Sequence, residues 1–280
     1  MLRRIVRSLL LVIFSGAFAA ALPANYARAV VFGDSLSDTG NVYRMTFGLY
    51  PPSPYWNGRF SNGPVWVETI AAHFGLRVDP SLGGGTNYAY GGAETGSGFS
   101  HAGTPNVERQ IDAFRSRYGQ FSQNDLVIFY IGANDFLSGQ TNPQIPLANI
   151  HNELQTLYNL GARNILVGNL PLLGYTPGAL GTPDQDTLNA LSLAFNQGLA
   201  LEFWAFKSTH PLATLTMLDV QRYFMLVRAF PLAFGFTNIT DSYMDSGSGD
   251  PDRYLFWDTV HPTRVMHAYF GGYAILNLQN

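Results

Sequence analysis

The 280-residue sequence contains no cysteine. This absence excludes disulfide bonds, thiolate metal ligands and a cysteine nucleophile, and also the lipid-modified cysteine that anchors a bacterial lipoprotein. Charged residues are scarce, because Asp, Glu, Lys and Arg make up 12% of the chain, about half of the usual share near 25%. The formal net charge is only -3, and the 16 Lys and Arg residues form no basic run. We therefore expect no nucleic-acid partner.

The N-terminus has the pattern of a secretory signal peptide. Three arginines within the first seven residues precede an apolar run from Leu9 to Leu22, which is rich in alanine near its end. The run is shorter than the roughly 20 residues of a membrane-spanning helix, which favours cleavage over an uncleaved anchor. We predict a signal peptide over residues 1–22, with cleavage between residues 19 and 24, and a secreted or periplasmic protein. The triplet Ala17-Phe18-Ala19 predicts Ala20, rather than Met1, as the first residue of the exported chain.

The rest of the chain, residues 23–280, is long enough for one large domain. Short apolar runs typical of strands alternate in it with helical patterns. The predicted strands are Ala29–Phe32, Asp125–Ile131, Ile165–Val167 and Ala213–Leu218; the predicted helices are Val65–Phe74, Val107–Tyr118, Asn149–Leu160, Asp184–Phe206, Gln221–Ala229 and Thr263–Leu278. The polar segment Thr240–Asp252 is predicted to be a loop. This alternation predicts an α/β fold with a mostly parallel sheet and helices on both faces.

Ser35 is the first candidate functional residue. It directly follows the first predicted strand, in Gly33-Asp34-Ser35-Leu36-Ser37-Asp38, and ligands of parallel α/β sheets bind outside the carboxyl ends of the strands. A serine at the start of a predicted helix has an exposed hydroxyl with backbone N–H groups nearby. Taken alone, this hexapeptide is more typical of a helix N-cap.

His261 is the candidate general base. A serine hydroxyl is a weak nucleophile until a base accepts its proton, and histidine suits this task near neutral pH. Asp258 lies three residues earlier, a spacing that lets its carboxylate and the imidazole share one tight turn and fixes the tautomer. The other histidines lie in predicted helices or lack an aspartate at such a spacing: His73, His101, His151, His210 and His267.

Two further segments offer donors for an oxyanion. Asn134 follows the buried strand that ends at Ile131, so its amide can donate into the crevice at the sheet edge. Residues 83–93 are dense in glycine, which lets a backbone N–H approach a substrate oxygen without an intervening Cβ. Each segment is also typical of ordinary structure, a turn for the asparagine and a flexible loop for the glycines.

Together these segments resemble the GDSL family, also called SGNH hydrolases, from Val30 to about Pro262. The resemblance identifies Ser35 as the nucleophile, Asp258 as the orienting acid and His261 as the base. It assigns the oxyanion hole to the backbone N–H groups of Ser35 and Gly91 and to the Asn134 side chain. In the block Asn87–Ala93, Gly92 is the alternative to Gly91, because the glycine pair makes the alignment ambiguous. Residues 58–63 also resemble a stretch of the lipase/esterase branch of the family.

The resemblance implies a three-layer α/β/α sandwich with a flavodoxin-like topology, which needs no metal and no cofactor. It implies a carboxylic ester hydrolase that acts through an acyl-enzyme on Ser35. One rival interpretation is a metal-dependent phosphodiesterase that uses Asp34, Asp38, Asp258 and His261 as ligands. Another is a non-catalytic binding protein with the same fold.

The substrate stays open at the level of sequence. The apolar segment Tyr223–Phe236 is interpreted either as an acyl-chain groove or transient membrane contact, or as an amphipathic helix packed on the sheet. The first interpretation favours esters of lipids, lysophospholipids or short acyl chains. The many Tyr and Trp residues suit a pocket for sugars or for a quaternary ammonium group instead, which leaves a carbohydrate O-acetyl esterase as the alternative.

Overall fold

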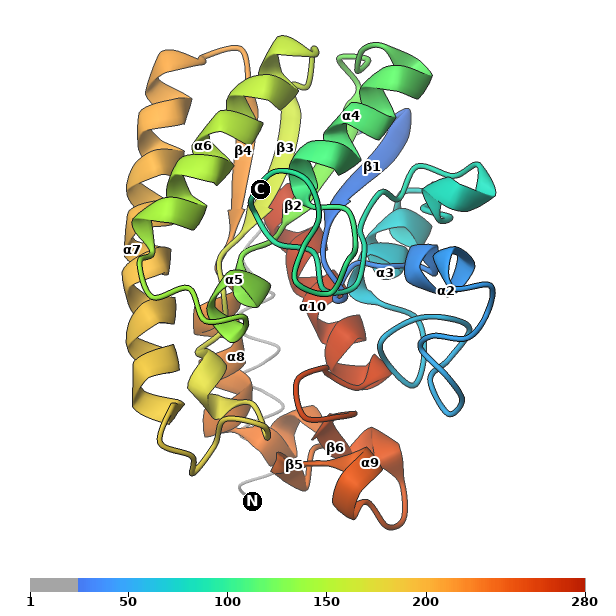
Figure 1. Cartoon of the computed structure of the whole chain (residues 1–280), viewed down its shortest axis with the longest axis vertical. Coiled ribbons are helices and arrows are strands. Elements are labelled where there is room, and N and C mark those ends of the chain that lie inside the picture. The colour runs from blue at the N-terminus through green and yellow to red at the C-terminus, as the bar shows by residue number, and fades with distance from the viewer. Residues whose placement is uncertain (1–24, 280) are drawn as a thin grey trace, which may run out of the picture.

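A computed structural model describes residues 25–279, and the predicted signal peptide lies outside these residues. Its centre is a four-stranded parallel sheet in the order β1-β2-β3-β4 (Figure 1). The strands are β1 (Arg28–Gly33), β2 (Asp125–Tyr130), β3 (Asn164–Gly168) and β4 (Thr214–Leu218). All six residues of β2 are buried, as expected of a central strand covered on both faces. A separate parallel pair, β5 (Asn238–Ser242) and β6 (Tyr254–Phe256), lies outside this sheet.

An extended segment, Thr86–Tyr90, lies along the outer edge of β1. The Val31 N–H donates to the Thr86 carbonyl (3.1 Å), and the Tyr88 N–H donates to the Val31 carbonyl (2.8 Å). With this segment counted as the second strand along the chain, the spatial order is 2-1-3-4-5, which is the predicted flavodoxin-like order. The strand order reverses between β1 and β2, and in such folds ligands bind at that switch point.

Helices cover both faces of the sheet and complete the predicted three-layer fold (Figure 1). On one face α4 packs on β1, α7 packs on β4, and α6 lies between them; on the other face α3 and α10 pack against each other. The helices are α2 (Asn41–Met45), α3 (Trp66–His73), α4 (Val107–Tyr118), α5 (Ala133–Leu137), α6 (Gln144–Asn159), α7 (Gln185–Thr209), α8 (Val220–Ala229), α9 (Tyr243–Ser246) and α10 (Arg264–Leu278). In the described part of the chain, no helix has the length and apolar character needed to cross a membrane.

Three local predictions differ from the structure. Ser35 does not begin a helix but lies in a turn, and the next helix, α2, starts only at Asn41. The predicted loop Thr240–Asp252 contains the end of β5, all of α9 and part of a 3₁₀ turn. Helix α6 begins at Gln144, five residues before the predicted start, and includes Pro146. A proline in the first turn is compatible with a helix, because the N–H groups there have no intrahelical partner.

Candidate active site

The end of β1 fixes the position of Ser35. Gly33 must be a glycine, because a Cβ there would lie 2.3 Å from the Tyr130 carbonyl oxygen of β2. The Gln110 side chain of α4 clamps this residue, since it accepts from the Gly33 N–H and donates to the Gly33 carbonyl, both at 2.9 Å. The turn then closes with a hydrogen bond from the Ser37 N–H to the Asp34 carbonyl (3.1 Å). Ser35 therefore follows the rigid end of β1, at the switch point of the sheet.

Asp258 and His261 lie in one turn between β6 and α10. Asp258 Oδ1 accepts hydrogen bonds from the backbone N–H groups of Val260 (2.8 Å) and His261 (2.7 Å). The Trp257 N–H donates to the His261 carbonyl (2.8 Å) and closes the turn. The Ser61 hydroxyl binds the Pro262 carbonyl (2.8 Å) and fixes the turn to the segment before α3. The three-residue spacing thus brings carboxylate and imidazole together by local hydrogen bonds.

The imidazole of His261 connects this turn to Ser35. Its Nδ1 lies 2.6 Å from Asp258 Oδ2, and its Nε2 lies 2.8 Å from Ser35 Oγ. The Tyr55 hydroxyl also donates to Asp258 Oδ2 (2.6 Å). Burial by itself raises the pKa of the Asp258 carboxyl, but the charge of His261 and the hydrogen bonds from His261 and Tyr55 outweigh burial and hold this pKa well below its usual range. The carboxylate is therefore ionised and can stabilise an imidazolium.

The Gly91 amide already has a hydrogen-bond partner within the protein. Its N–H donates to Asp38 Oδ2 (3.0 Å), so this group is not free to bind an oxyanion. Gly91 must be a glycine for a different reason, because a Cβ there would lie 2.3 Å from the Phe60 ring. The alternative, Gly92, has a φ of 77°, and within residues 25–279 its N–H donates to no acceptor. In the described part of the chain the Gly91 N–H is thus paired and the Gly92 N–H is not.

Asn134 lies beside Ser35, in the first turn of α5. One of its amide hydrogens is used by the Ala93 carbonyl, which accepts from Nδ2 at 2.9 Å. The second amide hydrogen remains available, and the side chain lines the same pocket as Ser35. The Ala93 carbonyl, next to Gly92, thus fixes the orientation of the Asn134 side chain at this pocket.

The four groups of the metal hypothesis do not form one cluster. Asp38 accepts four backbone N–H groups, from Gly40, Asn41, Val42 and Gly91. Burial raises the pKa of Asp38 to about 6 and that of Asp34 to about 7. Among residues 25–279 no three acidic or histidine side chains come together in an arrangement suited to a metal ion. Asp38 instead holds the chain after Ser35 against the glycine pair.

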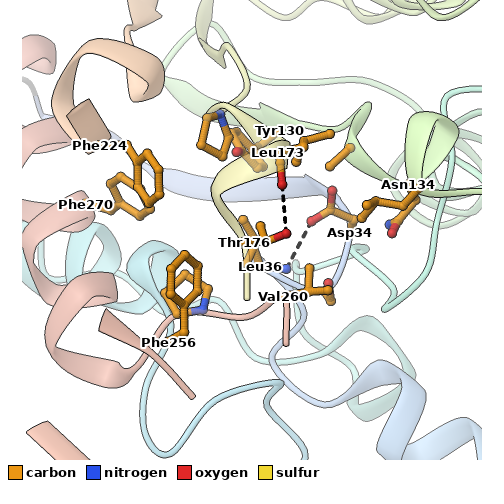
Figure 2. Close-up of a pocket in the computed structure, with 15 residues that line it drawn as sticks. Asp34, Leu36, Tyr130, Asn134, Leu173, Thr176, Phe224, Phe256, Val260 and Phe270 are labelled. Atoms are coloured by element: carbon orange, nitrogen blue, oxygen red, sulfur yellow. Dashed lines mark hydrogen bonds between the residues drawn. The ribbon is translucent and has the colours of Figure 1, made fainter. Parts of the chain in front are cut away.

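Ser35 lines a narrow, mostly apolar pocket, which Figure 2 shows. The space inside it that admits the centre of a water-sized sphere is about 40 Å³, so the pocket is narrow. Asp34 and Asn134 lie at one end, and Phe224 and Phe270 lie at the other, with Phe256 near them. The wall between them is formed mostly by apolar side chains: Leu36, Ala133, Leu137, Pro171, Leu173, Val260 and Pro262. The pocket beside Ser35 is thus lined mostly by apolar groups.

A family model described as GDSL-like lipase/acylhydrolase matches residues 30–273. The chain belongs to this family. It is 29% identical to the phosphatidylcholine-sterol acyltransferase of Aeromonas hydrophila, over 87% of each chain, and 27% identical to a GDSL esterase/lipase of Arabidopsis thaliana, over 86% of each chain. These matches make the protein a carboxylic ester hydrolase.

Solved structures agree on the fold. The acetylxylan esterase Axe2 of Geobacillus stearothermophilus superposes with a TM-score of 0.52 at 15% identity, over 92% of this chain and 97% of that chain. Because the identity is this low, the likeness shows the fold alone. The family and the fold predicted from the sequence are thus both confirmed.

Several residues of this GDSL hydrolase site were not predicted. Phe60, whose ring centroid lies 5.2 Å from that of His261, belongs to residues 58–63, which were noted only for their family resemblance. Tyr55, which donates to Asp258, lies just before that stretch. Part of the segment Tyr223–Phe236 forms a packed amphipathic helix, which was one of its two interpretations. Helix α8 packs as an amphipathic helix, with Phe224 and Val227 buried, and Phe224 also forms the far end of the pocket.

Proposed function

We propose that the protein is an exported serine ester hydrolase, in which Ser35 attacks esters whose acyl group is an apolar chain. The observation that carries the proposal is the 2.8 Å contact between His261 Nε2 and Ser35 Oγ at the mouth of an apolar pocket. Export rests on the signal-peptide pattern before residue 23.

The first half of the reaction forms an acyl-enzyme. Ser35 Oγ bonds to the ester carbonyl carbon while His261 Nε2 accepts its proton. The negative charge on the carbonyl oxygen is held by the Asn134 amide and by the backbone N–H groups of Ser35 and Gly92; each such donor is typically worth about 100- to 1,000-fold in turnover. The carbon–oxygen bond to the alcohol then breaks, and His261 gives its proton to the leaving oxygen. Asp258 stabilises the imidazolium throughout.

The second half consumes water. His261 accepts a proton from a water molecule, whose oxygen bonds to the acyl carbon, and then returns the proton to Ser35 Oγ as the acid leaves. No other reactant is needed, which fits a family of hydrolases.

The pocket supports an acyl chain as the buried part of the substrate. Each methylene that moves from water into an apolar site gains about 0.8 kcal/mol, or about fourfold in kcat/KM. The name of the Aeromonas relative, a phosphatidylcholine-sterol acyltransferase, supports lipid esters as the natural class. A carbohydrate O-acetyl ester would leave the far end of the pocket, at Phe224 and Phe270, empty.

A panel of p-nitrophenyl esters with rising acyl length tests this proposal, with a lysophospholipid and acetylated xylan beside it. We expect kcat/KM to rise by about fourfold per methylene until the chain reaches Phe224. In Phe224→Leu the optimum should shift to longer chains, because the smaller side chain lengthens the pocket.

Val227→Ala is the matched control for this variant. Val227 is buried in the same helix, α8, but does not line the pocket. Val227→Ala should lower the free energy of unfolding by about 0.5 to 1.5 kcal/mol per methylene removed. It should leave the optimal acyl length unchanged. A preference of the wild type for acetylated xylan over every acyl-chain ester would contradict the proposed substrate class.

A further inference from the structure

An uncharged loop with large exposed apolar side chains follows helix α2. Between Arg44 and Arg59 the sequence contains no charged residue, and we call residues 46–57 the aromatic loop. The fractional exposure of its side chains is 95% for Phe47 and 77% for Leu49. Tyr50 and Trp56 are exposed as well, at 52% and 38%. Single exposed apolar residues are ordinary, but a group of four on one loop marks a contact surface.

Phe47 has an unfavourable backbone conformation that packing of its side chain against the described residues does not offset. Its φ is 55°, in the left-handed region that a bulky side chain rarely adopts. A glycine or asparagine would adopt this conformation at lower cost. Since the side chain is almost fully exposed, it has no packing within the protein that offsets the cost. The value of a phenylalanine at this position therefore lies in a contact outside the chain.

The aromatic loop is joined directly to the active site. Tyr55, within the loop, donates to Asp258 Oδ2. The Tyr50 ring contacts Phe60 at 5.7 Å between centroids, and Phe60 in turn lies 5.2 Å from His261. Figure 1 shows this part of the chain beside α2, on the side of the molecule opposite α7. Whatever binds the loop is thus held next to the catalytic turn.

The chemistry of the loop fits a lipid surface better than a protein partner. Its phenylalanine and leucine suit the acyl region of a bilayer, and its tyrosines and tryptophan suit the headgroup level. The loop carries no acidic residue that would repel lipid phosphates, and Arg44 at its base is exposed. We propose that the aromatic loop docks the enzyme on the surface of a lipid bilayer and so presents the active site to esters held there. This proposal rests on the proposed function for the identity of the substrate.

Sedimentation with vesicles tests the docking without any turnover. The wild type should bind vesicles of phosphatidylcholine and bind more tightly when phosphatidylglycerol is added, because of Arg44. Phe47→Ser combined with Leu49→Ser should weaken binding at least about tenfold, since each buried side chain of this size is worth that factor or more. Leu201→Ser is the matched control, because Leu201 is 73% exposed but lies on α7. It should leave vesicle binding unchanged.

Hydrolysis measured in two forms of substrate separates docking from catalysis. With a short, water-soluble p-nitrophenyl ester, the double variant should stay within about twofold of the wild type. With a long-chain ester embedded in vesicles, it should lose at least about tenfold. If the wild type did not hydrolyse the soluble ester, the proposed function would be wrong. The docking measured by sedimentation would be unaffected by that result.

Three results would overturn the docking proposal. The wild type could fail to bind vesicles, or the double variant could bind them as tightly as the wild type. The third result is a dimer of the wild type in solution that the double variant loses, since the loop would then be covered by a second copy of the chain. All three proteins carry the same N-terminus, so a difference between them reports the substituted side chains alone.

Discussion

Ser35→Ala is expected to reduce ester hydrolysis by at least about 10⁴-fold while the protein stays folded. The variant loses the oxygen that His261 Nε2 contacts at 2.8 Å, and so no acyl-enzyme can form. The cost to stability is small, about 1 kcal/mol for one hydrogen bond. Initial rates with a p-nitrophenyl ester and a thermal unfolding curve measure the two quantities.

Ser37→Ala is the control for this prediction. Ser37 lies two residues further along the same turn, is fully buried, and accepts a hydrogen bond from Trp66 Nε1 (3.1 Å). Its removal leaves a buried indole N–H without an acceptor, which costs about 1 to 3 kcal/mol of stability. Activity below the unfolding temperature should stay within about tenfold of the wild type. If Ser35→Ala hydrolysed esters as fast as Ser37→Ala, Ser35 could not be the nucleophile.

Asp258→Asn should lower kcat by about 10⁴-fold. The structure supplies the reason, because the two carboxylate oxygens have different partners. Oδ1 accepts two backbone N–H groups, so the amide oxygen of an asparagine must take that place. The NH₂ group then faces His261 Nδ1 and donates to it. This selects the tautomer that carries its proton on Nε2, and such an imidazole cannot accept the proton of Ser35.

Tyr55→Phe tests whether the loss of kcat in Asp258→Asn comes from the tautomer of His261 or from the general polarity of this turn. It removes one donor to Asp258 Oδ2 but leaves the carboxylate and its contact with His261 Nδ1 in place. The pKa of Asp258 should rise, since one of the hydrogen bonds that lower it is lost. We expect less than a tenfold loss of kcat, about the value of one hydrogen bond. Equal losses in Asp258→Asn and Tyr55→Phe would contradict the tautomer argument.

The sheet and most of the long helices follow from local sequence patterns. Asp125–Tyr130 is a continuous apolar run and becomes the fully buried strand β2, while Val107–Tyr118 has helical spacing and becomes α4 with the predicted bounds. The candidate residues Ser35, Asp258 and His261 could be selected from the sequence for a related reason. Ser35 follows a strand, and the pair Asp258 and His261 needs only one turn, so both depend on neighbours in sequence.

Features that depend on distant contacts were not predictable. The Gly91 N–H is taken by Asp38, 53 residues away, and no local pattern distinguishes it from Gly92. Tyr55 reaches Asp258 across 203 residues. The far end of the pocket combines Phe224 with Phe256 and Phe270 from three separate elements. Short helices such as α2 and α5 form because the tertiary structure holds them, since isolated helices of this length are not stable.

The most direct test of the mechanism is covalent labelling with a fluorophosphonate, followed by peptide mass spectrometry. The reagent bonds to a serine oxygen only when a neighbouring base activates it. We expect one adduct, on the peptide that contains Ser35, formed at the same rate with or without a chelator and greatly slowed in Asp258→Asn. An adduct on a different residue, or protein that hydrolyses esters at full rate without any adduct, would contradict the proposed role of Ser35.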